Sequence, residues 1–452
     1  MKYNYCLSLS GIIRLSAWML LSASIIAQAE DAPANDGETG QSAVAPLPTP
    51  LTLDAVMRSV DQTHPDLLVA QARIQVNNAR LLQADSAYGF RAFILGEARY
   101  IEPSPIALDQ SQDDSRISLV AQKRLYDFGR TANAEKAAMA DVKSSEWSYQ
   151  NAVNQYRIAI MESYFKVLLA DLQFIRNNEA MSVAYIDYDR MQMRNELGQR
   201  SDIEVLESQS NYQKVRRELY ASRSMQRNTR SQLANMLNRP GELVADIVEP
   251  KLPDIDRPIP EVEVLQEQAL TNNPMLMALR AQVEAAEKRL AAARSGSRPT
   301  LAGEAQVSEY SRTAGNYNEW EASLILNVPL LNGGKVKADV AQQQAEVIRL
   351  KAELRKAEMD VQQAILDNLQ MLDTLKVERE EMKALLDYRD LYLDRSRALY
   401  EMEVKTDLGD SMVEVSEARL KFARAKFTTA LTWARLDALL GNEVYAVKEN
   451  TQ

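Results

Sequence analysis

Cysteine and histidine are nearly absent from this chain of 452 residues. The one cysteine, Cys6, lies in a segment that we expect to be removed, so the mature chain would have no disulfide, thiol nucleophile or thiolate metal site. The one histidine, His64, excludes a histidine cluster for metal and any Ser-His-Asp relay that does not use it. Asn273 holds the matching place later in the chain, and both residues directly precede a proline. We therefore predict a helix-entry role for His64, no catalytic residue, no metal site, no cofactor and no enzymatic activity.

Long apolar segments are also missing, apart from one near the N-terminus. Lys2 and Arg14 precede an apolar stretch from Leu15 to Ile26, and Ala27-Gln28-Ala29 follows as the small-x-small pattern of a signal peptidase site. The stretch is shorter than the roughly 20 residues that a spanning helix needs, so we interpret residues 1–29 as a signal peptide and not as an anchor. If the mature chain crosses a membrane, it must then do so as a closed β-barrel.

The balance of charge is acidic, with 53 basic and 63 acidic residues. Removal of the two basic residues of the signal peptide would leave a net charge of −12, which argues against nucleic acid as a partner. Glycine is scarce, at 15 residues, while Ala, Leu, Glu, Gln, Arg and Lys are abundant, a composition typical of long helices. Residues 30–50 are rich in Pro, Gly, Ala and acidic residues, so we expect a flexible leader there.

Two unrelated sequence landmarks recur at nearly the same offset. The apolar-periodic helix and x-Pro step of residues 53–65 return at 264–274, about 209 residues later. The turn Leu125–Arg130 returns as Leu330–Lys335, about 205 residues later. This agreement predicts an internal duplication. The expected divisions are a first repeat at 51–239, a Pro-rich linker at 240–261, a second repeat at 262–442 and a C-terminal tail at 443–452.

Each repeat has the same expected order of elements. A helix of about 24 residues leads into two β segments, a very long helix, a polar break and a return helix that ends near Asn238 or Gly441. The expected helices before the strands are 65–88 and 274–297, and the expected long helices are 130–196 and 335–402. A helix rises about 1.5 Å per residue, so the long helix spans roughly 100 Å and the two shorter ones together about 95 Å. One long helix can therefore run antiparallel to two shorter helices stacked end to end.

The β segments alternate between apolar and polar residues. In 320–330 every second residue is apolar, and 117–125 repeats this less cleanly, with Val120 and Lys123 as exceptions. Their partner segments, 91–101 and 301–310, show a weaker pattern, and the polar connectors 102–115 and 311–318 fit exposed loops. Strands of about 9 to 11 residues with this alternation suit lipid on one side and water on the other. A half-buried soluble hairpin packed on the helices is the alternative.

Four strands are too few to close a barrel that encloses water, so the chain must assemble. A three-fold ring would give twelve strands and twelve full-length helical staves.

The duplicated order of elements resembles the TolC or outer-membrane efflux protein family over about residues 51–442. The most specific stretches are 53–84, 124–134, 198–209 and 326–335. The third is similar to the family's helix-tip motif, Gly-x-x-Ser-x-x-Asp-Val-Leu-x-Ala-Gln, with Glu204 in the acidic position and Ser208 in place of the alanine.

The resemblance implies an α+β membrane protein that forms a homotrimer. Its twelve-stranded barrel would lie in the outer membrane, in contact with lipid, and continue as a periplasmic α-helical barrel of antiparallel coiled-coil helices. The implied function is the exit duct of a tripartite system for multidrug efflux or type I secretion. The implied partners are a periplasmic adaptor (membrane fusion) protein and an inner-membrane transporter, either an RND pump or an ABC exporter. A soluble periplasmic coiled-coil scaffold or adaptor is the alternative, and lipid-facing strands and a repeated glycine turn favour the duct.

Three groups of candidate site residues follow. The exposed turn at the first helix tip, where glycine lets a partner approach closely, is the candidate docking site for the adaptor. The strand-to-helix turns form the second group, and acidic and basic residues at the second tip form the third, as candidates for the periplasmic gate and its selectivity. The docking candidates are Leu197, Gly198, Gln199, Arg200 and Ser201; the turn residues are Gly129, Arg130, Gly333 and Gly334; the gate candidates are Asp407, Asp410, Lys405 and Glu403.

The second tip departs from the family pattern. Glu403 occupies the slot that matches Gly198, and a gapless alignment puts Gly409 and Met412 where the family has two gate aspartates. Asp407 and Asp410 have the right mutual spacing, two positions earlier. They share a helix face and could form a ring of carboxylates in a three-fold assembly, or they could serve only to offset the helix macrodipole.

Overall fold

The computed structural model describes residues 48–58, 64–242, 246–312, 317–404 and 407–445. The predicted signal peptide, most of the leader, the end of the tail and Lys405 lie outside the described residues. All described residues belong to one compact unit, Pro48–Gln452. Within the described residues, no helix combines the length and the apolar character that a membrane span requires.

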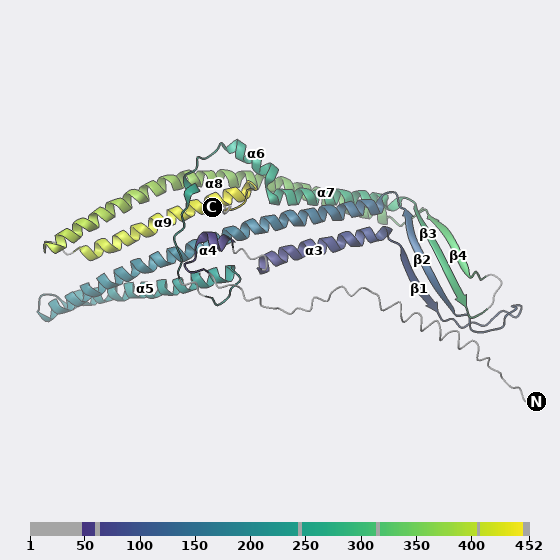
Figure 1. Cartoon of the computed structure of the whole chain (residues 1–452), viewed down its shortest axis with the longest axis horizontal. Coiled ribbons are helices and arrows are strands. Elements are labelled where there is room, and N and C mark those ends of the chain that lie inside the picture. The colour runs from purple at the N-terminus through teal and green to yellow at the C-terminus, as the bar shows by residue number, and fades with distance from the viewer. Residues whose placement is uncertain (1–47, 59–63, 243–245, 313–316, 405–406, 446–452) are drawn as a thin grey trace, which may run out of the picture. The chain divides into compact units, whose positions relative to one another are not determined.

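The two halves of the unit contain matching series of elements (Figure 1). The first half has α2 (Leu53–Arg58), α3 (Pro65–Asp85), η2 (Ser86–Tyr88), β1 (Arg91–Glu97), β2 (Arg116–Tyr126), α4 (Arg130–Glu196) and α5 (Asp202–Met236). The second half has η3 (Pro253–Asp256), α6 (Val262–Asn272), α7 (Pro274–Arg294), η4 (Ser295–Ser297), β3 (Thr300–Tyr310), β4 (Trp320–Asn327), α8 (Lys335–Glu401) and α9 (Leu408–Leu439). Helices α4 and α8 each contain 67 residues.

Proline and its preceding residue fix the start of α3 and of α7. Each helix has proline at its first position, where the missing N–H costs no hydrogen bond. His64 caps α3 by accepting a hydrogen bond from the Asp66 N–H at Nδ1 (3.3 Å), and Asn273 caps α7 by accepting one from the Leu276 N–H (3.1 Å). His64 is also buried against the ring of Tyr156, at a centroid distance of 4.6 Å. The predicted helix-entry role of His64 is confirmed.

Helix α4 has the expected bounds and α8 ends one residue earlier than expected, whereas two strands are shorter than predicted. β1 is regular only as far as Glu97, but its pairing with β2 continues in the same register, through a hydrogen bond from the Asp114 N–H to the Arg99 carbonyl (2.8 Å), to an isolated bridge between Tyr100 and Asp113. β4 ends at Asn327 and not at 330, because Pro329 has no N–H for the ladder and restricts the residue before it.

The four strands form one antiparallel sheet in the order β1-β2-β3-β4, with β1 and β4 at its edges. Since β2 pairs with β3, the sheet joins the two halves of the chain. Figure 1 shows the sheet beyond one end of α3, α4 and α7, while the turns that follow α4 and α8 lie at the opposite end of the helices.

Each long helix packs against two shorter helices, as the helix lengths predict. Helices α3 and α5 both pack on α4, and α7 and α9 both pack on α8. Helix α4 also contacts α7 and α9, so the halves share their interior. At this junction the ring of Phe165 on α4 stacks on that of Phe427 on α9 (4.6 Å, 4° between planes), and both side chains are buried.

The linker between the halves is held against the helices. Its residue Ile247 pairs with Leu51 in a parallel bridge, and the Tyr164 hydroxyl on α4 donates to the carbonyls of both Leu51 (3.0 Å) and Val248 (2.5 Å). Burial raises the pKa of Tyr164 to about 12. Farther along, the guanidinium of Arg257 lies 3.9 Å from the ring centre of Trp433 on α9.

Candidate functional site

One face of the sheet is apolar and exposed. The pairing places Ile94 beside Leu119, Leu119 beside Val307 and Val307 beside Trp320, so one row of large apolar side chains crosses all four strands. The large apolar side chains of this face are 45% to 73% exposed: Ile94, Ile117, Leu119, Leu125, Val307, Trp320, Leu324 and Leu326. An apolar face of this extent needs another surface or lipid to cover it.

The opposite face carries polar cross-strand pairs. Ser118 and Ser308 share a hydrogen bond (2.9 Å), and the Gln122 amide donates to Glu304 (2.8 Å). The predicted alternation of apolar and polar faces is therefore present in the structure. The two expected exceptions are present, since Val120 is buried on the polar face and Lys123 lies on the apolar face. Three further exceptions, Phe93, Leu95 and Ile325, are exposed apolar residues on the polar face.

The two strand-to-helix turns have the same backbone. Gly129 and Gly334 cap α4 and α8 with φ of 80° and 82°. The residues before them also have positive φ, 56° at Phe128 and 59° at Gly333. A non-glycine residue in this conformation is strained, so the surroundings of Phe128 must hold it. Arg130, predicted as part of the first turn, is the first residue of α4.

A buried carboxylate braces the first turn. Asp127 accepts hydrogen bonds from the Tyr88 hydroxyl (2.6 Å), the Thr131 N–H (3.0 Å) and the Thr131 hydroxyl. Burial alone would raise the pKa of Asp127, but the hydrogen bonds from Thr131 and Tyr88 outweigh it and hold the pKa below its ordinary value. Burial and the bond to Asp127 raise the pKa of Tyr88 to about 12. The second turn has Asn332 in the matching position.

The five docking candidates form an ordered turn between α4 and α5. Gly198, with φ of 71°, ends α4 in a Schellman motif: its N–H bonds to the Asn195 carbonyl (2.8 Å), and that of Gln199 bonds to the Arg194 carbonyl (2.9 Å). Nothing lies within 4 Å of the place that a Cβ on Gly198 would take. Leu197 beside it is 71% exposed.

The start of α5 is fixed by a capping box. Ser201 and Glu204 bond to each other's backbone N–H groups, and Arg200 forms an ion pair with Glu204 (2.6 Å). The backbone bond from Ser201 and then the bond from Arg200 lower the pKa of Glu204. The turn is therefore a preformed surface with an exposed apolar residue beside an open glycine.

The second tip repeats the Schellman motif without glycine. Glu403 has φ of 58°, its N–H bonds to the Tyr400 carbonyl (3.0 Å), and the Val404 N–H bonds to the Leu399 carbonyl (3.0 Å). Glu403 therefore occupies the backbone position of Gly198, as the alignment predicts.

Asp407 and Asp410 lie one turn apart at the start of α9, but different neighbours surround their carboxylates. Asp407 is the cap residue and accepts a hydrogen bond from the Tyr392 hydroxyl of α8 (2.9 Å). The side chain of Asp410 is exposed, and its pKa is raised first by desolvation from the neighbouring helices and then by the charges of Asp187, Glu414 and Asp407. Asp187 belongs to α4. Carboxylates therefore gather where α9 approaches α4, and two of them form ion pairs, Asp187 with Arg190 (3.7 Å) and Glu414 with Arg389.

The sequence did not predict one close contact, which lies between α4 and α9. A Cβ on Gly409 would lie 2.8 Å from Val183 Cγ2, so the absence of a side chain lets the helices approach at this point. Arg176 on α4 adds ion pairs to Glu417 on α9 (3.0 Å) and Glu218 on α5 (3.8 Å). The glycine early in α9 was the only signal in the sequence. Among the described residues, no group of three or more His, Cys, Asp or Glu side chains is placed to hold a metal ion.

The structure combines an antiparallel sheet that has one exposed apolar face with two helices of 67 residues each, an arrangement that suits strands facing lipid. Comparison with known proteins agrees. Residues 265–442 match the model of the family described as outer membrane efflux protein.

Individual relatives support the same class. The chain is 28% identical over 182 residues to the probable outer membrane lipoprotein SilC of Salmonella typhimurium, a match that covers 38% of this chain and 37% of that protein. The fold is similar to that of the outer membrane protein VceC of Vibrio cholerae (TM-score 0.67, 17% identity, 87% of this chain and 96% of that chain). It is also similar to the CmeC outer membrane channel of Campylobacter jejuni (TM-score 0.70, 13% identity, 87% of each chain).

Proposed function

We propose that this chain is one subunit of an outer-membrane exit duct, the passive conduit of a tripartite export system. The observation that carries the proposal is the exposed apolar face of a four-stranded sheet that continues into long antiparallel helices. Lipid covers such a face when the strands span a membrane. In this proposal the sheet lies in the outer membrane, the helices lie in the periplasm, and residues 1–29 direct export.

The duct is a homotrimer. One chain leaves the outer edges of β1 and β4 without partners in its own sheet, and four strands cannot enclose a water-filled channel. Pairing β4 of one copy with β1 of the next closes a ring of twelve strands. Exposed apolar side chains on the helices, such as Val76 and Leu82 on α3 and Ile348 and Val377 on α8, fit burial between neighbouring copies.

The two halves are duplicated structural units. Repeats at 51–239 and 262–442, joined by the linker 240–261, account for the equal lengths of α4 and α8, and for the 21 residues of both α3 and α7. The repetition gives each copy of the chain two full-length staves of the periplasmic tube.

Fractionation and conductance test the duct directly. We expect the protein to sediment with outer membranes, to need detergent for extraction, to migrate as a trimer and to form pores in planar bilayers. A water-soluble monomer without conductance would instead favour the alternative function, a periplasmic coiled-coil scaffold or adaptor.

The tips of the helices contact a periplasmic adaptor protein, which joins the duct to an inner-membrane transporter. The turn Leu197–Ser201 is the docking surface, because it is ordered, exposed and open at Gly198. Gly198→Trp should abolish export and leave the yield of trimer unchanged. Gly241→Trp is the matched control, since Gly241 also has positive φ (89°) and open surroundings but lies in the linker. Normal export in Gly198→Trp would place the contact elsewhere.

The gate lies where α9 approaches α4. Asp410, whose side chain is exposed, is the pore carboxylate of this proposal, whereas Asp407 accepts a hydrogen bond from the Tyr392 hydroxyl of α8 and its side chain makes no cap hydrogen bond to α9. A ring of such carboxylates makes a pore cation-selective. Asp410→Asn should reduce that selectivity in bilayer recordings, with Asp407→Asn as the comparison. Unchanged selectivity in Asp410→Asn would remove it from the pore.

The duct could carry either of two classes of cargo: drugs, in multidrug efflux with an RND pump, or proteins, in type I secretion with an ABC exporter. Deleting the gene and measuring both drug sensitivity and the export of a large secreted protein separates them. Drug sensitivity alone supports efflux, and loss of the secreted protein alone supports secretion.

A further inference from the structure

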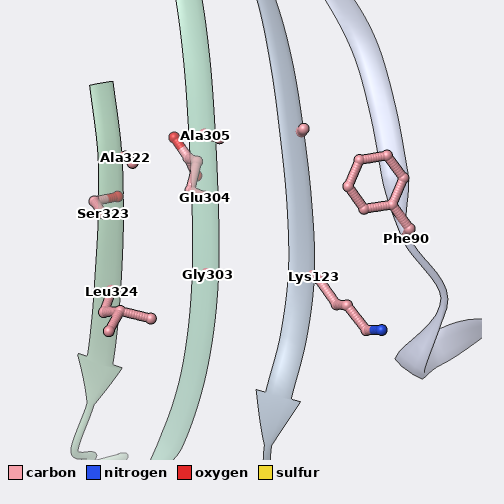
Figure 2. A pocket seen from close by; sticks show the side chains of 9 residues that line it. Phe90, Lys123, Gly303, Glu304, Ala305, Ala322, Ser323 and Leu324 are labelled. Atoms are coloured by element: carbon pink, nitrogen blue, oxygen red, sulfur yellow. The ribbon is translucent and has the colours of Figure 1, made fainter. Parts of the chain in front are cut away.

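A hollow of about 630 Å³ opens on the apolar face of the sheet (Figure 2). It spans β2, β3 and β4 and is lined by the large side chains of Phe90 and Leu324 and by small apolar residues between them. The polar residues Lys123, Glu304 and Ser323 complete the lining. It lies in the half of the sheet that leads into the helices, because β2 enters α4 seven residues after Lys123. This position matters for the kind of lipid that reaches it.

The strand register creates the hollow. Ala121 pairs with Ala305, and Ala305 pairs with Ala322, so three alanines lie side by side. Gly303, in the next row, has no side chain of its own, and Leu125 Cδ1 lies 3.5 Å from the place that its Cβ would take. The row on the other side of the alanines contains Leu119, Val307 and Trp320, which are much larger. The surface over the alanines is therefore lower than the neighbouring surface of the apolar face, and a flexible hydrocarbon chain can fill the difference.

Lys123 places a positive charge at the edge of this apolar hollow. Figure 2 shows its side chain extending from β2 toward the side on which Phe90 lies. No ion pair or hydrogen bond links Lys123 to another residue in the part of the chain that the structure describes. The nearby carboxylate Glu304 accepts instead from Gln122 on the opposite face. A lysine among lipid-facing apolar residues is costly unless an anion or the aqueous interface receives its charge.

The depth of Lys123 fits the headgroup region. It lies three residues before the end of β2 at Tyr126, which corresponds to about 10 Å along a strand. In the proposed orientation the helices are periplasmic, so this half of the sheet faces the inner leaflet of the outer membrane. That leaflet consists of phospholipids, whose phosphates can form charge-assisted hydrogen bonds with an ammonium group.

We propose that this hollow is a binding site for an anionic phospholipid of the inner leaflet. One acyl chain lies over Ala121, Ala305 and Ala322, between Phe90 and Leu324, and the headgroup phosphate binds the Lys123 ammonium. The inference rests on the proposed outer-membrane location. The inference adds two details to the proposed exit duct, the class of lipid that it binds and the residue that binds it.

The test uses the full-length protein purified from outer membranes and placed in nanodiscs that contain phosphatidylglycerol, phosphatidylethanolamine and lipid A. Native mass spectrometry then counts the lipids that remain bound after the nanodisc is dispersed. We expect wild type to retain phosphatidylglycerol in preference to phosphatidylethanolamine. Lys123→Gln should lower this preference about fivefold, the effect of one basic residue near an anionic surface. Lys123→Arg, which keeps the charge, should retain it.

Two further variants separate charge from shape. Arg91→Gln is the matched charge control, because Arg91 pairs with Gln122 and so lies on the opposite face at nearly the same level. It should leave the preference unchanged. Ala305→Phe fills the floor of the hollow and should reduce retention of both phospholipids while Lys123 is intact. Ile94→Phe enlarges an apolar residue outside the hollow and should have no effect.

The outcomes distinguish this inference from the proposed function. Absence of wild type from the outer membrane would overturn both. Wild type in the outer membrane with an unchanged lipid preference in Lys123→Gln would overturn the inference alone, and the side chain would then only reach toward interfacial water. Retention of lipid A in place of phospholipid would also overturn it.

Discussion

The contact between Gly409 and Val183 allows a direct test of how closely α4 and α9 must pack at the tip. A methyl group added at Gly409 would lie 2.8 Å from Cγ2 and 3.5 Å from Cγ1 of Val183. Carbon atoms in ordinary contact are about 3.5 to 4.0 Å apart, so Gly409→Ala requires a local separation of roughly 1 Å. Val183 cannot easily turn aside, because a β-branched side chain in a helix has one strongly preferred rotamer.

Two opposing effects set the magnitude. Overpacking costs about 1 to 3 kcal/mol, while replacing glycine by alanine in a helix contributes roughly 0.5 to 1 kcal/mol in favour of the folded state. The expected net loss of stability for Gly409→Ala is therefore on the order of 1 kcal/mol. In an assembled duct the same separation would move α9 away from α4 and widen the passage at the tip.

Thermal unfolding and single-channel conductance measure these two consequences. Gly409→Ala should melt earlier and conduct more than wild type, and Val183→Ala in the same chain should restore both values. Gly96→Ala should change neither, because nothing lies within 4 Å of the added atom. If Gly409→Ala behaves like wild type, or if Val183→Ala does not rescue it, the packing argument is wrong.

Three other substitutions probe single positions. Glu403→Gly should stabilise the second tip by about 1 kcal/mol, measured by hydrogen exchange, because glycine adopts positive φ without strain. Asp410→Asn should raise the melting temperature slightly at pH 7 and lose that advantage below about pH 4. Desolvation first, and then the charge of Asp187, raise the native pKa of this exposed carboxylate, so its ionised form opposes folding, although water screens the effect. Asp127→Asn should have the opposite pH dependence. We expect it to lower the free energy of unfolding by about 1 to 2 kcal/mol at pH 7 and to have no effect in acid. The reason is that the hydrogen bonds that lower the pKa of Asp127, including that from Tyr88, favour its ionised form.

Most helix boundaries could be predicted because local chemistry determines them. Proline at the first position, glycine at the turns and a capping box at Ser201 act within a few residues of the boundary they set. The faces of the strands could be predicted for the same reason, since alternation is a local pattern. The ends of β1 and β4 were placed too late. The pairing of β1 with β2 is irregular after Glu97 and resumes in the same register at the bridge between Tyr100 and Asp113, so the predicted end at 101 marks the end of the pairing and not of the regular strand. Pro329 ends β4 inside an apolar run that is otherwise typical of a strand.

The candidate gate shows where sequence reasoning reaches its limit. Spacing placed Asp407 and Asp410 on one helix face, but their neighbours come from other elements: Tyr392 from α8 and Asp187 from α4. A period of 3.6 residues describes one helix and says nothing about what packs against it. The approach of Val183 could not be seen for the same reason.

The two halves reach the same backbone with different residues. At the strand-to-helix turn the first half has Phe128 where the second has Gly333, with φ of 56° and 59°. At the helix tip the assignment is reversed, since the first half has Gly198 and the second has Glu403, with φ of 71° and 58°. Glycine therefore does not by itself determine either turn, because each turn also forms around a residue that is strained there. The helices and strands that flank each turn fix its geometry. A residue of the turn is thus free to change its side chain, and the two tips can present different chemistry, an open apolar surface at Leu197 and an acidic one at Glu403, on equivalent backbones.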